Sequence, residues 1–218
     1  MPREDLRQVT TSNCLAMAKS CPHFKLLQDR LAELSTKFVA DQAAAENADP
    51  ATFQPDLDRL AAFRLLIHAE IEDFLEVKAK ENIAAIYARL NSASWMRQSP
   101  ELLPLAIALK KPLPLPDALD PSRFGIFVNE LLAGARNAIA ENNGVKVSSF
   151  LLLSICSGKT VDEVDAILSL SLNSYGKGRG DVAHKSVTHS TSLQAPSAEL
   201  TTARTLVEQI GKYFDVCA

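Results

Sequence analysis

The segment from Asp56 to about Leu90 most constrains the fold, because its apolar residues follow a helical period over many turns. They recur at spacings of three and four, which places them on one face of a helix: Leu60, Phe63, Ile67, Ile71, Phe74 and Leu75. One long amphipathic helix is therefore expected here. Such a face is buried by packing against other helices, so the segment favours an all-α, antiparallel helical bundle.

The residues that precede this segment also predict helices. Leu6–Ala18 and Phe24 to about Ala45 carry helical patterns, separated by the breaker Ser20-Cys21-Pro22. A polar loop is expected at 46–55. We expect residues 1–55 to form an N-terminal helical extension, with extra N-terminal helices added to a helical domain at 56–218.

The second half of the chain predicts four more helical segments. Phe124 to Ile139 carries an amphipathic stripe and is followed by the stop signal Asn142-Asn143-Gly144. The apolar segment Val147–Cys156 fits a helix or a strand, and its helical surroundings favour a helix. Thr160-Val-Asp-Glu163 fits a capping box and predicts a helix that begins at Val161. A last helix is expected over Ala198–Val216.

Between the two halves, Ser92 to Pro121 contains six prolines, three of them in the stretch "KKPLPLPD". Proline removes a backbone donor and fixes φ, so this segment is expected to be irregular or extended. We interpret it as a proline-rich insert near residues 100–121 of the helical domain.

Composition excludes some classes of protein. A net charge of −3 over 218 residues argues against coating nucleic acid by bulk electrostatics, but a local basic site remains open. The charged N-terminus lacks the apolar stretch of a signal peptide, and no apolar run is long enough to span a bilayer, so we expect a cytoplasmic protein with no membrane partner. The four cysteines form no Cys-x-x-Cys pair, and we expect reduced thiols, no cofactor and no metal site.

Two short motifs resemble known signals but lack what those signals need. Ser157-Gly158-Lys159-Thr160 resembles the end of a phosphate-binding P-loop, yet Leu153 stands where the motif needs glycine. We interpret it as a helix stop followed by a capping threonine. Arg179-Gly180-Asp181 as a cell-adhesion signal would require secretion, which nothing here supports.

Two charged helical pairs are also interpreted as structural. His68 and Glu72 share a helix face, and we expect a surface or boundary pair rather than a metal site. The segment from Arg136 to Glu141 carries glutamate where the motif described next has histidine. We interpret it as the solvated face of an amphipathic helix.

The stretch "GKGRGDVAHKS", Gly176 to Ser186, combines the residue types that metal-free RNA cleavage needs. Arg179 and His184 are five positions apart, an offset of about 140 degrees on a helix, so they would flank a groove. Across a two-fold interface, two copies would place two arginines and two histidines around one cavity. A histidine would take the proton from the 2′-OH, and the arginines would stabilise the developing phosphoryl charge. Lys177 and Lys185 could hold flanking phosphates.

An all-α chain with this Arg-x4-His motif ahead of a last amphipathic helix resembles the HEPN superfamily. The local form "RGDVAH" is similar to its RiboL-PSP-HEPN branch, as is "HAEIEDFLE" (His68–Glu76) on the long helix. The resemblance covers about 56–90 and 124–214. It implies Arg179 and His184 as the catalytic pair and Glu72 as their acidic neighbour, with Asp181 as polar helper in place of the residue after the arginine, which is Gly180 here.

The resemblance also implies a function and partners. Members of the family are typically metal-independent endoribonucleases, active as homodimers, in toxin–antitoxin and antiviral defence. We expect an RNA substrate, and an inhibitory antitoxin or defence-system partner. The alternatives are a non-catalytic HEPN module that binds nucleotides or RNA or neutralises a toxin, and a helical interaction protein whose "KKPLPLPD" docks a partner groove.

Overall fold

The computed structural model describes residues 19–90, 101–112, 121–184 and 193–217, and at 90, 121–122 and 178–184 it describes the backbone alone. This part of the chain forms eight α-helices, one short 3₁₀ helix and one pair of two-residue strands, so the predicted all-α class is confirmed. The predicted helix at 6–18 lies outside the described residues, as does Cys14.

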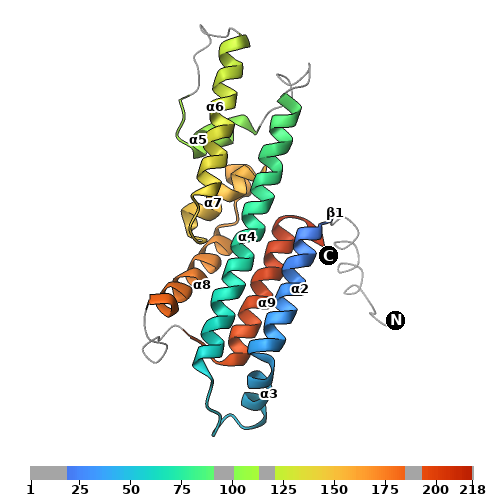
Figure 1. The fold of residues 1–218 in the computed structure, drawn as a ribbon, viewed down its shortest axis with the longest axis vertical. Coiled ribbons are helices and arrows are strands. Elements are labelled where there is room, and N and C mark those ends of the chain that lie inside the picture. The colour runs from blue at the N-terminus through green and yellow to red at the C-terminus, as the bar shows by residue number, and fades with distance from the viewer. Residues whose placement is uncertain (1–18, 91–100, 113–120, 185–192, 218) are drawn as a thin grey trace, which may run out of the picture.

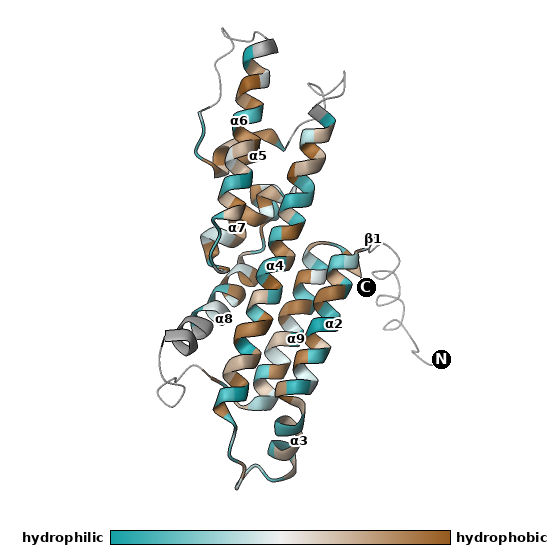
Figure 2. Ribbon diagram, in the orientation of Figure 1, coloured by the Kyte–Doolittle hydropathy of each residue, from teal (hydrophilic) through white to brown (hydrophobic). Residues whose placement is uncertain are grey.

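The long helix α4 (Leu57–Leu90) runs along the molecule and organises it (Figure 1). Around one end of α4 lie α2 (Pro22–Phe38), α3 (Ala40–Ala48) and α9 (Pro196–Tyr213). Around the other end lie α5 (Leu102–Ala108), α6 (Pro121–Ala140) and α7 (Val147–Cys156), and α8 (Ala166–His184) lies beside the middle of α4. The predicted long helix is confirmed. Figure 2 shows hydrophobic residues recurring along the whole length of α4. Most of them are fully buried: Leu60, Phe63, Ile67, Ile71, Leu75, Ala79 and Ile83.

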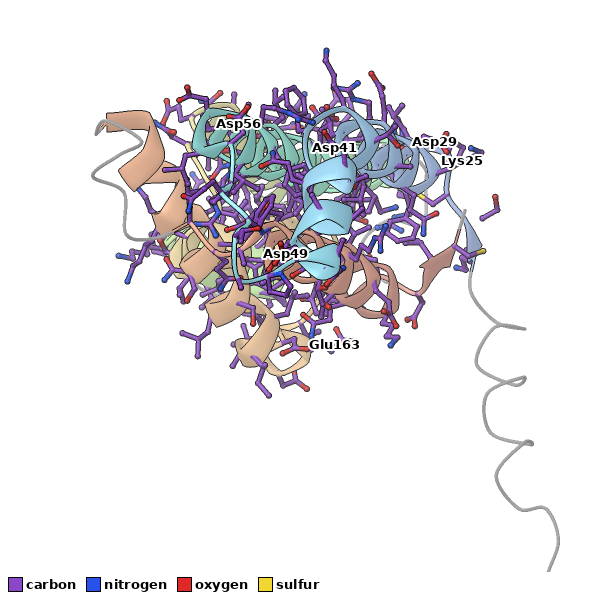
Figure 3. The ribbon with its side chains drawn as sticks, turned by 90° about the horizontal axis from the view of Figure 1, so that it is seen from below. Lys25, Asp29, Asp41, Asp49, Asp56 and Glu163 are labelled. Atoms are coloured by element: carbon purple, nitrogen blue, oxygen red, sulfur yellow. The ribbon has the colours of Figure 1, made fainter. Side chains whose placement is uncertain are left out.

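The single helix expected over Phe24–Ala45 is in fact two helices. The chain turns at Val39, whose side chain is completely buried. α3 then runs to Ala48 and packs beside α9. Figure 3 views the molecule from this end and shows Asp41, Asp49 and Asp56 around α3. The residues expected to form an N-terminal extension thus contribute Phe24, Leu27 and others to the same hydrophobic cluster as α4.

The proline-rich segment contains a helix that periodicity did not predict. α5 (Leu102–Ala108) buries Leu102, Leu105 and Ala106. Pro104 is tolerated because it stands in the first turn, where its missing N–H has no intrahelical acceptor. The expectation of irregular structure is therefore wrong for residues 102–108. Most of the stretch "KKPLPLPD" falls in residues 113–120, which lie outside the described residues.

The first two helices of the second half form as predicted, and the later ones differ in where they begin or end. α6 (Pro121–Ala140) ends before Gly144, which adopts a positive φ of 84°, and α7 (Val147–Cys156) is a helix. The capping box at Thr160 is present, but it opens only the 3₁₀ turn η3 (Val161–Glu163). The following helix α8 (Ala166–His184) begins later because Asp165 Oδ1 accepts the N–H groups of Ile167 at 2.8 Å and Leu168 at 2.9 Å.

The last helix also ends earlier than predicted. α9 stops at Tyr213, Asp215 takes a left-handed φ of 52°, and Val216–Cys217 (β2) pairs in parallel with Lys19–Ser20 (β1). Figure 1 shows β1 and the C-terminus together at one end of α2 and α9. The two ends of the described chain are therefore tied side by side.

Candidate functional site

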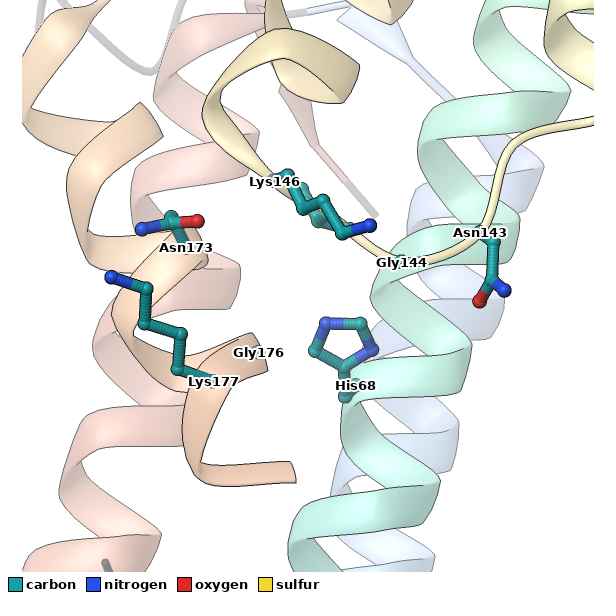
Figure 4. Close-up of a pocket in the computed structure, with 8 residues that line it drawn as sticks. His68, Asn143, Gly144, Lys146, Asn173, Gly176 and Lys177 are labelled. Carbon is teal, nitrogen blue, oxygen red and sulfur yellow. The ribbon is translucent and has the colours of Figure 1, made fainter. Parts of the chain in front are cut away.

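A cavity of about 270 Å³ lies between α4, the α6–α7 turn and α8 (Figure 4). Its lining is rich in nitrogen-bearing side chains from three separate parts of the sequence. Lys146 comes from the turn, His68 from α4, and Lys177 with Asn173 from α8. The full lining comprises His68, Asn143, Gly144, Val145, Lys146, Asn173, Gly176 and Lys177.

His68 forms the α4 wall of this cavity. Its side chain is only 3% exposed, so the expected surface or boundary pair with Glu72 is wrong for His68. The imidazole Nδ1 lies 3.8 Å from Glu72 Oε2, and the ring stacks on Tyr175 of α8 with centroids 6.5 Å apart. The histidine is therefore held from both sides, by a carboxylate on its own helix and by an aromatic ring across the interface.

Glu72 anchors the turn that forms the roof of the cavity. Its Oε1 accepts hydrogen bonds from Asn142 Nδ2 at 3.1 Å and from the backbone N–H of Gly144. Asn142 Nδ2 also lies 3.2 Å from Glu76 Oε1. The carboxylate thus orients both His68 and the α6–α7 turn. Glu72 does not itself line the cavity, and it affects the cavity by positioning residues that do.

Gly176 lets α8 approach His68 closely. A Cβ atom built on this glycine would lie 2.8 Å from His68 Nε2, a separation that real Cβ atoms essentially never show. The first glycine of "GKGRGDVAHKS" therefore has a packing reason, which is to bring the backbone of α8 against the imidazole. His68 begins the stretch "HAEIEDFLE", and Gly176 precedes the stretch "RGDVAH" by three positions, so the two stretches approach each other near this contact.

The helix continues from the cavity through the predicted catalytic residues. Arg179, Asp181 and His184 lie in the last two turns of α8, where only the backbone is described. Arg179 follows Gly176 by three positions, so its backbone lies one turn beyond the His68 contact. Lys177 lines the cavity, whereas Lys185 lies outside the described residues.

A buried ion pair lies beneath this part of α8. Arg64 of α4 donates to both carboxylate oxygens of Glu199 on α9, with 3.1 Å between Nε and Oε2, and Glu199 is completely buried. Burial raises the pKa of Glu199, and the N–H of Gln194 together with Arg64 partly opposes that shift. The Arg64 guanidinium carbon also lies 5.4 Å from the centroid of the Tyr175 ring.

Tyr175 connects this ion pair to the cavity. Burial beside Glu199 raises the pKa of the Tyr175 phenol, so the hydroxyl stays protonated. Its ring lies between the guanidinium of Arg64 and the imidazole of His68. Tyr175 therefore links His68 in the cavity wall to Arg64, which in turn binds Glu199 of α9.

Two of the segments interpreted as structural have the expected local structure. Gly158 adopts a φ of 94° at the end of α7, and Thr160 N–H and Oγ1 lie 2.7 and 2.8 Å from Glu163 Oε2. Arg136 and Glu141 are exposed, with Arg136 stacked 5.1 Å above the Tyr87 ring.

Within the described part of the chain, no three His, Cys, Asp or Glu side chains gather as a metal site would require. Among the helices described, none combines the length and apolarity needed to cross a bilayer.

Comparisons with known proteins give no independent assignment. No protein-family model matches the sequence, and no similar curated protein or solved structure is found. The site must therefore be interpreted from its own residues.

Sequence reasoning missed several of those residues. It gave Lys177 and Glu72 roles near the site, but assigned none to Lys146 or Asn173 and treated His68 as peripheral. His68 follows the core residue Ile67 and precedes Ile71 by three positions, so the helical period itself placed it at the edge of the buried face.

Proposed function

We propose that the chain is a metal-independent endoribonuclease of the HEPN type, which cleaves RNA at the α4–α8 face. The observation that carries the proposal is the close approach of Gly176 to His68. It brings the stretch that begins at His68 within one helical turn of the Arg-x4-His motif, at a cavity that Lys146 and Lys177 also line. A phosphodiester backbone needs cations and hydrogen-bond donors that converge from several elements.

In the proposed reaction, His184 accepts the proton of the 2′-OH, which attacks the adjacent phosphorus and expels the 5′-oxygen. The products are a 2′,3′-cyclic phosphate and a 5′-hydroxyl end, with the leaving oxygen protonated by a histidine or water. Arg179 stabilises the charge on the phosphoryl oxygens and Asp181 orients the arginine. Lys177 and Lys185 bind flanking phosphates, and Glu72 acts through His68 and the α6–α7 turn.

The proposal includes a homodimer, because one Arg-x4-His pair on one helix supplies a single base and a single arginine. Two copies of α8 across a two-fold axis would supply both acid and base. It also includes a role as a toxin or antiviral defence effector with an inhibitory partner. The non-catalytic alternative retains RNA binding at the same cavity without turnover.

The test is cleavage of cellular RNA and tRNA by the purified chain in EDTA, beside the variants His184→Ala and Arg179→Ala. His189→Ala serves as the matched control, because it removes a histidine outside the motif. We expect cyclic phosphate ends from the wild type and the control only, and a dimer mass by sedimentation.

Equal cleavage by the wild type and His184→Ala would contradict the proposed site. RNA binding that is weakened by Lys177→Gln, without cleavage by any variant, would instead support the non-catalytic module.

A further inference from the structure

A second and larger cavity lies at the opposite end of α2 from α3, where β1 and β2 pair. It has a volume of about 550 Å³ and is enclosed by β1, the start of α2, α4, the α7–η3 turn and the end of α9. Figure 1 shows β1, the start of α2 and the end of α9 together near the C-terminus. This volume lies in the range of sites for small organic ligands.

Three lysines from distant parts of the sequence line this second cavity. They are Lys19 of β1, Lys78 of α4 and Lys159 of the α7–η3 turn. The chain as a whole carries a net charge of −3, so three ammonium groups at one cavity are a local reversal of its charge.

The acidic residues at the cavity are already engaged by other groups. Glu163 accepts the N–H and hydroxyl of Thr160 at 2.7 and 2.8 Å. Glu81 lies 3.1 Å from His23 Nε2 and 3.4 Å from Lys78 Nζ. Lys159 is held differently, with its ammonium 5.1 Å from the centroid of the Tyr213 ring, a contact that leaves its N–H groups able to donate.

One wall of the cavity is aromatic and apolar. Phe214, Val216 and Pro22 contribute to it, and Val216 pairs with Lys19 through the two short strands. A volume of this size exceeds what a single phosphate ion would occupy, and an aromatic wall suits a flat heterocycle. The lining thus combines three cations with an aromatic side chain, which suits an anion that also carries a heterocyclic base.

We propose that this second cavity binds a nucleoside polyphosphate, with its phosphates against Lys19, Lys78 and Lys159 and its base toward Phe214. The mode differs from a P-loop. The segment Ser157-Gly158-Lys159-Thr160 follows a helix and opens only a three-residue 3₁₀ turn, so Lys159 contributes a side-chain cation and no backbone phosphate cradle is formed.

The test is calorimetric titration of the full chain, in EDTA at low salt, with ATP, pyrophosphate and adenosine as probes. We expect ATP to bind most tightly, pyrophosphate more weakly, and adenosine without measurable heat. Binding should weaken as salt is raised, because the contacts are ionic and partly exposed.

Variants locate the site. Lys159→Gln and Lys78→Gln should each weaken ATP binding about tenfold, the factor expected for one lost charge-assisted hydrogen bond. Glu81→Gln should strengthen it, because it removes a negative charge and releases Lys78. Lys146→Gln is the matched control, since that lysine lines the cavity between α4 and α8. Thermal unfolding of each variant checks that it is folded.

Three outcomes would overturn the proposal. They are no binding of ATP or pyrophosphate by the wild type, unchanged ATP binding in both lysine variants, and adenosine binding as tight as ATP. If ATP binding were weakened only in Lys146→Gln, the phosphates would bind in the first cavity, and the proposal would also be overturned. The proposal is independent of RNA cleavage, because His184→Ala should abolish cleavage and leave ATP binding unchanged.

Discussion

The two faces of α4 are packed by helices of different construction. α9 presents a regular apolar stripe, including Ala203, Leu206, Val207 and Ile210, and is pinned to α4 by the buried pair of Arg64 and Glu199. α8 buries Leu168, Leu172 and Tyr175, and then continues through three glycines toward His184. The first helix supplies an interface that depends on close packing and a buried charge. In α8, the glycines lower the helix propensity, and Gly176 allows the backbone to approach His68 closely.

The strongest way to break the α9 face is to remove its buried carboxylate. Glu199→Ala leaves Arg64 buried without its partner, and we expect a loss of about 3–5 kcal/mol in the free energy of unfolding. Urea denaturation measures it. The matched control is Glu208→Ala on the exposed side of the same helix, where an exposed pair with Lys212 contributes less than about 1 kcal/mol. Equal losses in the two variants would contradict a structural role for the buried pair.

The next test concerns the close approach of α9 to α2, which packs beside it on the same side of the molecule. A Cβ on Gly211 would lie 2.5 Å from Phe24 Cζ, so Gly211→Ala forces the buried ring to move. We expect a loss of about 1–3 kcal/mol from overpacking, measured by thermal and urea unfolding. Gly125→Ala in α6 is the control, because nothing lies within 4 Å of its Cβ. That substitution should stabilise the protein by about 0.5–1 kcal/mol through helix propensity.

On the α8 face, the corresponding change should act on function more than on stability. Gly176→Ala places a Cβ 2.8 Å from His68 Nε2 and displaces the imidazole, while the new alanine favours the helix. We expect a net stability change below about 1 kcal/mol. RNA cleavage, as proposed above, should fall at least about tenfold, which corresponds to about 1.4 kcal/mol in the barrier. A large stability loss with unchanged cleavage would reverse the distinction between the two faces.

The smallest expected effect lies at the rim, where Asp41 of α3 pairs with Arg59 of α4. The hydrogen bond from Arg59 lowers the pKa of Asp41 below its ordinary value of 3.8. Stability from this group is therefore present above pH 3.8 and is lost as the pH falls through the lowered pKa. Asp41→Asn should make the fall in melting temperature between pH 5 and pH 2 slightly shallower, by a few degrees at most as a rough estimate for one surface group. A steeper fall in the variant would contradict this sign.

The helical framework could be predicted from the sequence because it depends on local periodicity. The apolar residues of α4, α6 and α9 repeat at helical spacing, and turn signals such as Gly144 mark their ends. The break at Val39 could not be predicted, because no glycine or proline marks it and burial of the valine against other helices decides the turn. The helix α5 could not be predicted because it contains Pro104. The number of prolines in a segment does not distinguish a proline in the first turn of a helix from one that breaks a helix.

The candidate site was predictable only in part, because some of its residues are brought together by contacts between distant helices. Periodicity and residue type single out Glu72, Lys177 and the stretch around Arg179. The partners of His68 come from residues about a hundred positions away, so its burial follows from the packing of α8 on α4. Lys146 lines the cavity because Glu72 fixes the α6–α7 turn through the N–H of Gly144. This contact joins two distant segments, so the residue spacing within either segment does not predict it.

The length of α4 has a consequence for how the molecule comes apart. Its 34 residues carry core side chains for α2 and α9 at one end and for α6 and α7 at the other, in one continuous hydrophobic cluster. Neither half can close its own interior without the same helix, so the two halves are not separable folding units. The amide hydrogens in the middle of α4 should therefore exchange with solvent only when the whole chain unfolds, while those of shorter helices such as α5 are released by local opening.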